Sequence, residues 1–281
     1  MRRALSFVPL PANPPLLLAA LLAALAATPA SARRIPVAPK LAPKPAERPA
    51  GTCAATCGLK PLFADTKEPA PIDAEVLGLC PTKAGDRIEP DDARAFFKKH
   101  LDDPRLSAAV REVAPHAPKD SARADWLAEI WTGPARRNAF THVLCGDDWD
   151  REKLGGLHLE ARFAQLEREG KICYGGPAHG GPAHDGQPCA NGQCLIRFTG
   201  LRGFSCGVKD TGGFLQDFDA LDLLTAGTRA FASCCMRRDK RDGGLYAGPR
   251  GVTFQVWCGE RNGRFGIASF YPSAGPPDCG P

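Results

Sequence analysis

The sequence lacks the features that mark several classes of protein. None of its apolar runs is long enough for a convincing membrane span, and no period or heptad runs through its 281 residues. Collagen, coiled coils and simple repeat arrays are therefore excluded. The net charge of +5 is too small for composition alone to indicate a nucleic-acid-binding protein. The hydrophobic content of 43% is too high for a disordered chain, so a folded core of ordinary size is expected.

The first 32 residues have the pattern of a secretory signal peptide. Arg2 and Arg3 provide the positive start, residues 16–27 the apolar stretch, and residues 30–32 the small side chains of a cleavage site. An uncleaved anchor is the weaker alternative, because an apolar stretch of twelve residues is short for a transmembrane helix. We therefore expect a secreted or periplasmic protein that has no membrane association after cleavage of its signal.

The cysteine content supports the same location. All twelve cysteines follow the predicted signal, and an even number in an exported chain favours disulfide bonds. The sequence does not define the pairing, except that the adjacent Cys234 and Cys235 are expected to have two different partners. The cysteines are Cys53, Cys57, Cys80, Cys145, Cys173, Cys189, Cys194, Cys206, Cys234, Cys235, Cys258 and Cys279.

Composition divides the remaining chain into three parts. A Pro/Ala-rich linker is predicted over 33–52, a helical region over 53–135, and a mixed region over 136–281. In the helical region, Asp91 or Asp92 is a candidate cap for the first helix and Ser121 for the third. The three helices are expected over 91–101, 106–113 and 121–131.

The mixed region alternates strand and helix signals. A strand-like run at 139–145 ends in a polar turn at 146–148, and the strongest helix signal follows at 157–169. Further strands are predicted at 171–174, 194–199, 252–258 and 264–271, the last two joined by a hairpin turn at 259–263, and a further helix at 217–235. Helices followed by mixed elements predict an α+β fold.

Two of the six histidines lie where a phosphate could bind. His142 lies in the strand-like run, and His158 begins the strongest predicted helix, directly after a glycine pair. Glycines allow close approach of a ligand to the backbone, and a helix N-terminus favours an anion. The alternative is that each histidine is simply a packed or solvated residue.

Lys209 is a third candidate. It lies in a glycine-rich segment, predicted to be a loop between a strand and a helix, where a lysine can stabilise a pentavalent phosphorane. The segment is not a Walker A pattern, and a solvated loop lysine is the common alternative.

Four residues spaced five apart, His179, His184, Cys189 and Cys194, suggest zinc. Their spacing is not one of the usual zinc patterns, and exported cysteines prefer disulfides, so we expect no metal ligands here.

Four motifs, in the right order, resemble the EndoU family of endoribonucleases. Residues 140–147 (FTHVLCGD) resemble its first histidine motif, FEHVFVGE, and residues 156–174 its second, GFHNW followed by an amphipathic helix, a glycine and a tyrosine. The segment around Lys209 is similar to the lysine motif, and residues 265–272 (FGIASFYP) to the closing YIGTAYP strand. The resemblance covers 139–272, and the two histidines are separated as in the family.

Several positions depart from the family pattern. Thr141 stands in place of a glutamate, Asp147 in place of another, and residues 159–160 in place of Asn-Trp. Gly213 stands in place of the serine expected four residues after the lysine, and Thr211 is the nearest hydroxyl. Because that serine helps to recognise uracil in relatives, a preference for uridylate stays open.

The resemblance implies a two-lobed core of antiparallel sheets and helices, with the N-terminal helices packed on it. It also implies cleavage of single-stranded RNA by 2′-OH attack, leaving 2′,3′-cyclic phosphate and 5′-hydroxyl ends. His142 and His158 would be the acid–base pair, in an order that stays open, and Lys209 the electrostatic stabiliser. Tyr271 would orient the sugar or stack on a base, near Thr211 and Gly213.

The resemblance also bears on cofactors and partners. The chemistry requires no cofactor, although Mn²⁺ or Ca²⁺ is a candidate activator, with Asp147 and Asp148 as candidate ligands. The alternative for both aspartates is a solvated turn. Single-stranded RNA is the expected partner, and an immunity protein is a further candidate.

Two alternatives belong to other classes of protein. One is a catalytically inactive RNA- or surface-binding module on the same scaffold. The other is a disulfide-rich structural exoprotein whose motif matches are chance. The placement of His142, His158 and Lys209 in one cleft, or their scatter, distinguishes the last alternative from an enzyme.

Overall fold

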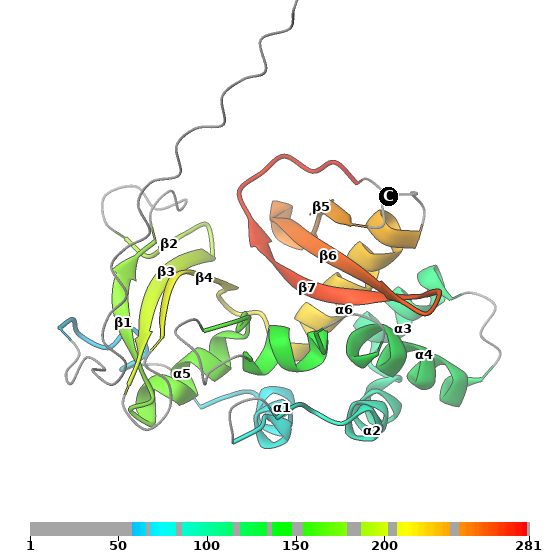
Figure 1. Ribbon diagram of the computed structural model, residues 1–281, viewed down its shortest axis with the longest axis horizontal. Helices are drawn as coiled ribbons and strands as arrows, with labels where there is room; N and C mark the ends of the chain where they lie inside the picture. The colour runs from blue at the N-terminus through cyan, green and yellow to red at the C-terminus, as the bar shows by residue number, and fades with distance from the viewer. Residues whose placement is uncertain are drawn as a thin grey trace, which may run out of the picture. The chain divides into compact units, whose positions relative to one another are not determined.

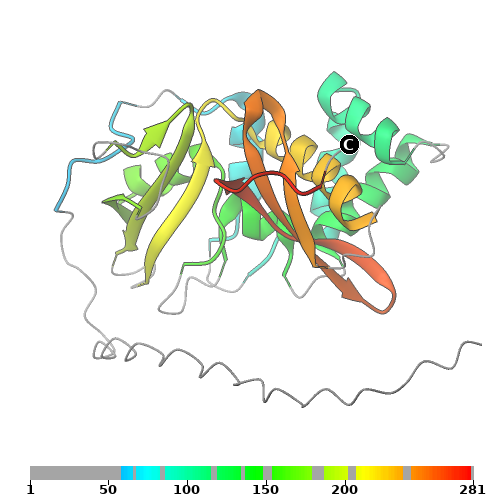
Figure 2. The ribbon, with the colours of Figure 1, turned by 90° about the horizontal axis from the view of Figure 1, so that it is seen from above.

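Figures 1 and 2 show the chain as a computed structural model. The structure describes residues 58–65, 68–82, 86–114, 119–133, 137–147, 154–178, 187–201, 207–236 and 242–279. Outside these ranges lie the predicted signal and linker, together with Cys53, Cys57, Cys206, His116, Asp148, His179 and His184.

The elements form an α+β fold, as the sequence predicted. Four helices come first: α1 (Pro71–Leu79), α2 (Pro90–His100), α3 (Pro104–Val113) and α4 (Asp120–Thr132). They are followed by a π-helical turn, η1 (Thr141–Cys145), helix α5 (Glu160–Arg168), and the strands β1 (Ile172–Pro177), β2 (Cys189–Ala190), β3 (Gln193–Gly200) and β4 (Val208–Leu215). The chain continues with α6 (Ala220–Ala230), η2 (Phe231–Met236), β5 (Gly243–Ala247), η3 (Pro249–Gly251), β6 (Thr253–Arg261) and β7 (Arg264–Ser273).

The strands form two antiparallel sheets, which lie side by side in both views (Figures 1 and 2). In the first sheet, β3 is central and pairs with β1, β2 and β4. The second is a meander in the order β5-β6-β7. Each sheet has its own apolar cluster. Phe163 of α5 packs on Phe198 and Phe214 in the first lobe, and Phe254 stacks on Phe270 in the second, with ring centroids 4.6 Å apart.

The N-terminal helices share the core of the second lobe. Trp131 of α4 is fully buried, and its indole N–H donates to the Thr228 hydroxyl of α6 at 3.1 Å. Arg105 of α3 donates to Asp219 and Asp222, the two residues that form the capping box of α6. These contacts join the described helices to α6 and its sheet. The boundary predicted at 135/136 stays a prediction.

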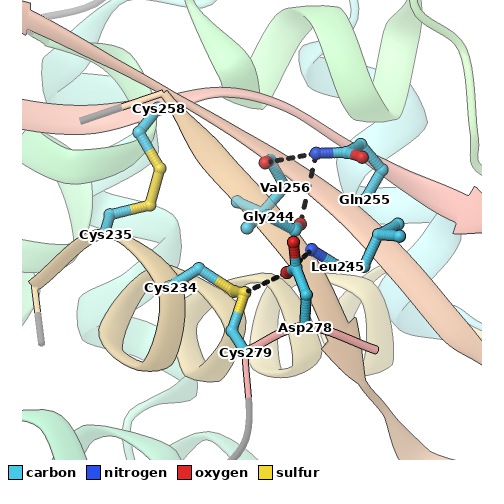
Figure 3. Close-up of a disulfide and its surroundings, with 9 residues drawn as sticks. All are labelled: Cys234, Cys235, Gly244, Leu245, Gln255, Val256, Cys258, Asp278 and Cys279. Atoms are coloured by element: carbon cyan, nitrogen blue, oxygen red, sulfur yellow. Dashed lines mark hydrogen bonds between the residues drawn. A yellow bond between two sulfur atoms is a disulfide. The ribbon is translucent and has the colours of Figure 1, made fainter. Parts of the chain in front are cut away.

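Disulfides also fix the second lobe. Cys234 pairs with Cys279 and Cys235 with Cys258, so the adjacent cysteines have different partners, as predicted (Figure 3). Cys80 pairs with Cys145. Several pairs in one chain fit an oxidising compartment. No helix in the described residues is long and apolar enough to cross a membrane.

The first sheet contains a short-range disulfide. Cys189 pairs with Cys194 across the β2–β3 turn, so neither sulfur is left for the zinc site considered from the sequence.

Two helix caps and the bounds of one helix differ from the sequence prediction. Glu89 precedes Pro90 at the start of α2, and Lys119 precedes α4, so neither Asp91, Asp92 nor Ser121 is the N-cap. The predicted helix over 217–235 begins only at Ala220, because Asp217 has a φ of 59°, and its last residues form the π-helical turn η2.

The strand predictions hold with changes of length. The strands expected at 171–174, 194–199, 252–258 and 264–271 are present as β1, β3, β6 and β7. The hairpin turn between β6 and β7 shortens to Asn262 and Gly263, both at positive φ. The sequence did not predict β4 and β5, which are rich in glycine.

Close packing at Gly227 of α6 yields a stability prediction. A Cβ at this position would lie 2.6 Å from Cη2 of Trp131, whereas a Cβ at Gly78 of α1 would meet nothing within 4 Å. Gly227→Ala should therefore lower the free energy of unfolding by about 1–3 kcal/mol, because the core is already filled. Gly78→Ala, the matched control, should raise it by about 0.4–1 kcal/mol. Chemical denaturation measures both, and a stabilised Gly227→Ala would contradict the packing described.

Candidate active site

A cleft of about 790 Å³ lies where β4 of the first sheet and β7 of the second approach each other. Every site residue predicted from the sequence lines it: His142, His158, Lys209, Tyr271, Thr211 and Gly213. These residues come from segments that are distant in the sequence. Chance motif matches would be expected to scatter over the structure instead.

His142 lies in η1, not in the strand predicted at 139–145. All five residues of η1 are buried, so the segment has no alternating exposed face to pair as a surface strand. The amide N–H of His142 donates to the Asn138 carbonyl at 2.8 Å, as in a helical turn. The ring Nδ1–H donates to Oδ1 of Asp147 at 2.7 Å, because a carboxylate oxygen can only accept. The Nε2 atom is thereby the free ring nitrogen of His142.

Asp147 is therefore a partner of His142 and not a residue of a solvated turn. Its main chain pairs with Gly155 through two hydrogen bonds of 3.0 and 2.9 Å. Burial acts to raise the pKa of Asp147, but the hydrogen bond from His142 and the charges of Arg137 and Lys209 hold that pKa below its usual value. Asp147 is consequently ionised at neutral pH.

His158 precedes α5 and does not belong to it. Gly156 and Leu157 have φ values of 60° and 67°, which a right-handed helix does not allow, so α5 begins at Glu160. His158 therefore lies directly before Leu159, the N-cap residue of α5, and not within the helix predicted from 157. A Cβ on Gly156 would overlap the carbonyl oxygen of His142, so the turn requires glycine.

Main-chain pairing holds the two histidines together. The amide of Leu157 donates to the His142 carbonyl, and the amide of His158 to the Val143 carbonyl, both at 2.7 Å. The ring centroids of His142 and His158 are 6.4 Å apart as a result.

The protonation of His158 follows from its surroundings. Its Nδ1–H donates to the Gly213 carbonyl at 2.7 Å, so the neutral ring has its lone pair on Nε2. Burial lowers the pKa of His158 well below the ordinary value, and the positive charge of Lys209 lowers it further, against the opposing effect of the Gly213 hydrogen bond. His158 is therefore neutral at pH 7.

Lys209 lies on β4, which corrects the predicted glycine-rich loop. Its ammonium group donates to the carbonyls of Gly156 at 2.7 Å and Leu154 at 3.3 Å. Burial lowers the pKa of Lys209 to about 8, opposed by the negative charge of Asp147 and assisted by the positive charge of Arg137. The ammonium is thus held against the turn that positions His158.

Aromatic side chains form another wall of the cleft. Tyr271 of β7 stacks on the ring of His158 with centroids 5.3 Å apart, and the indole N–H of Trp257 donates to its hydroxyl at 3.0 Å. Trp257 lines the cleft and is 46% exposed. The sequence analysis did not identify Trp257, and the only signal available for it was a tryptophan in a strand predicted to form a hairpin with the closing motif.

The position of the expected serine is closed to a side chain. A Cβ on Gly213 would lie 2.9 Å from Cδ2 of Leu195 and 3.4 Å from Cγ of Pro272. Thr211 is exposed on β4 and is the hydroxyl that this strand presents to the cleft.

No group of three or more His, Cys, Asp or Glu side chains gathers as metal ligands within the described residues. His142 donates to Oδ1 of Asp147, and Arg137 and Lys209 place positive charge near this carboxylate.

The fold is that of a two-lobed protein with a cleft between antiparallel sheets, and a solved structure shares it. XendoU, described as a splicing independent snoRNA processing endoribonuclease, is similar over 71% of this chain and 76% of that chain, with 17% identity and a TM-score of 0.52. The endoribonuclease Nsp15 of Middle East Respiratory Syndrome Coronavirus matches 48% of this chain and 33% of that chain, with 20% identity and a TM-score of 0.34, too low to define a shared fold. No protein-family model and no curated protein matches the sequence. The expected EndoU-like fold is confirmed.

The coupling of Lys209 to Asp147 is testable by titration. Lys209 loses its proton as the pH rises through about 8. Asp147→Asn removes a negative charge that favours the protonated form, so the midpoint should move below about 8. NMR of the lysine side chains measures this, with the resonance identified by its loss in Lys209→Met. Asp125→Asn, which removes a surface partner of Arg94, should leave the midpoint unchanged. A midpoint that does not move in Asp147→Asn would refute the coupling.

Proposed function

We propose that this protein is an endoribonuclease that cleaves single-stranded RNA by attack of the ribose 2′-OH on the adjacent phosphate. The products would be 2′,3′-cyclic phosphate and 5′-hydroxyl ends. One observation carries the proposal: a neutral histidine, a carboxylate-paired histidine and a half-buried ammonium line one cleft. Proton removal, proton donation and charge stabilisation are what this reaction needs without a metal.

The geometry supports a role for each group. His158 is neutral, with its lone pair on Nε2, and so suits the base that removes the 2′-OH proton. His142 suits the acid, because the Asp147 carboxylate accepts from its Nδ1–H and orients the ring, while Nε2 stays free to protonate the leaving 5′-oxygen. Lys209 would stabilise the negative charge that develops on the phosphorane.

The aromatic wall supports a single-stranded substrate. Bases of an unpaired strand can stack on exposed rings, and Trp257 and Tyr271 present such a surface beside His158. The uridylate preference left open by the resemblance would depend here on Thr211, because Gly213 has no side chain to bind a base.

The proposal includes the setting in which the protein works. Secretion or periplasmic export is supported by the signal-like first 32 residues and by the disulfides. An exported ribonuclease could act as a toxin or as an RNA-scavenging enzyme. An immunity protein would be its partner if it is a toxin. Activation by Mn²⁺ or Ca²⁺ would appear as faster RNA cleavage when either ion is added.

The test is cleavage of a fluorescent single-stranded RNA by the oxidised chain from residue 33, with and without Mn²⁺ and Ca²⁺. We expect cyclic-phosphate ends and no cleavage of an all-2′-deoxy strand. His158→Ala should lower kcat by about 100- to 10,000-fold, the usual contribution of an acid or base. His100→Ala, whose ring pairs with Glu75 on α1 and does not line the cleft, is the matched control and should leave kcat unchanged.

Two outcomes would overturn the proposal. Cleavage of the deoxy strand would exclude the 2′-OH mechanism. An intact fold with no cleavage in any condition would favour the RNA- or surface-binding module instead.

Substitution of Trp257 tests the stacking surface. Trp257→Ala should raise KM for RNA by roughly 5- to 100-fold with little change in kcat, because stacking contributes about 1–3 kcal/mol per base. Trp257→Phe keeps a ring but loses the hydrogen bond to Tyr271, and should retain most of the affinity. If both variants weaken RNA binding equally, the hydrogen bond matters and the stacking surface does not.

A further inference from the structure

A segment from the N-terminal region is fastened to the turn that carries His142. We call residues 80–82 and 86–88 the strap. Its first attachment is covalent, because Cys80 at the end of α1 is bonded to Cys145, the last residue of η1. Cys145 lies three residues after His142, and both cysteines are buried.

The second attachment of the strap is a buried hydrogen-bond network. The amide of Ile88 donates to the Thr141 hydroxyl at 2.9 Å, and the Asn138 side-chain amide donates to the Ile88 carbonyl at 2.8 Å. The oxygen of the same Asn138 side chain accepts from the Thr141 amide at 2.9 Å. The strap thus holds η1 at both ends, before and after His142.

The strap is itself anchored in the body of the protein. Val76 of α1 is fully buried, and Oδ1 of Asp73 accepts from the Ala220 amide at the start of α6, at 2.7 Å. The disulfide at Cys80 therefore attaches η1 to a helix that is itself fixed in the core. Gly146, directly after Cys145, has a φ of 81°, and η1 ends there.

A displacement of η1 would move both histidines. His142 belongs to the turn, and the carbonyls of His142 and Val143 accept from the amides of Leu157 and His158. The strap therefore affects the positions of the proposed acid, the proposed base and the Gly156 carbonyl that binds Lys209.

We propose that the Cys80–Cys145 disulfide is a positioning device for both histidines, so that the cleft becomes fully active only after the chain is oxidised. This inference rests on the proposed function. Two thiols lose two protons and two electrons to a disulfide oxidant, such as oxidised glutathione, which is released as two thiols. In a reducing compartment the pair stays open and the nuclease stays weak, which would protect the RNA of the producing cell.

The experiment compares two double variants that each remove one disulfide. Cys80→Ala with Cys145→Ala frees the strap. Cys234→Ala with Cys279→Ala removes the disulfide drawn in Figure 3 and is the matched control. Its sequence separation of 45 is comparable with 65, and neither of its cysteines lines the cleft. Disulfides closing loops of similar length contribute similar stability, so thermal midpoints should fall by similar amounts.

At a temperature well below the thermal midpoints of both variants, kcat should differ between them. We expect a fall of about ten-fold or more in the Cys80/Cys145 variant, since a misplacement near 1 Å can cost about 100-fold. The control should stay within about two-fold of the wild type, because neither of its cysteines belongs to η1 or lines the cleft. Equal kcat in the two variants would overturn the proposal and leave the disulfide a purely stabilising role.

A second readout needs no RNA. Hydrogen exchange of the Leu157 and His158 amides reports the pairing with η1, and it should quicken in the Cys80/Cys145 variant but not in the control. Unchanged exchange would overturn the positioning role even if RNA is cleaved. Quickened exchange in a protein whose wild type cleaves no RNA would support the role while refuting the proposed function.

A refolding time course tests the redox dependence. The reduced wild-type chain is oxidised with glutathione, and activity should rise with the Cys80–Cys145 linked peptide and not with the Cys234–Cys279 peptide. Full activity before the first pair forms would contradict the proposal.

Discussion

The cleft depends on one short piece of main-chain pairing, in which the amides of Leu157 and His158 meet the carbonyls of His142 and Val143. The two histidines come from segments of different kinds, a buried π-helical turn and an irregular segment before α5. Two hydrogen bonds of 2.7 Å bring them together, and Gly156 is the residue that lets the backbones approach so closely. Lys209 then binds the carbonyl of the same glycine. The three candidate catalytic groups are therefore arranged around a single turn.

Much of the fold could be predicted from the sequence because its elements have strong periodicity. The helix near 91–101 and the hairpin of β6 and β7 have regular apolar patterns, and the structure has them. The elements that were missed have patterns that mislead. Every residue of η1 is buried, so a short apolar run there reads as a strand. Strand β4 contains adjacent glycines, which read as a loop, but Gly212 and Gly213 lie where Phe198 and Leu195 fill the space of a side chain.

The candidate site could be predicted only in part. The trio of His142, His158 and Lys209 was found through the order and spacing of family motifs, and the cleft contains all three. The environment of each group was not predictable, because it depends on contacts between distant segments. Asp147 reads as a turn residue, and only the fold shows its carboxylate on His142. The exposed indole of Trp257 likewise becomes meaningful only where β6 and β7 place it beside Tyr271.

The two histidines also differ in how easily evolution can change their tautomers. The partner of the His142 ring is a side chain, and one nucleotide change in the Asp147 codon can remove it. The partner of the His158 ring is the peptide carbonyl of Gly213, which every amino acid at that position would still possess. A single substitution at Asp147 can thus remove the hydrogen-bond acceptor of the His142 ring. No substitution at Gly213 removes the acceptor of the His158 ring, because that acceptor belongs to the main chain.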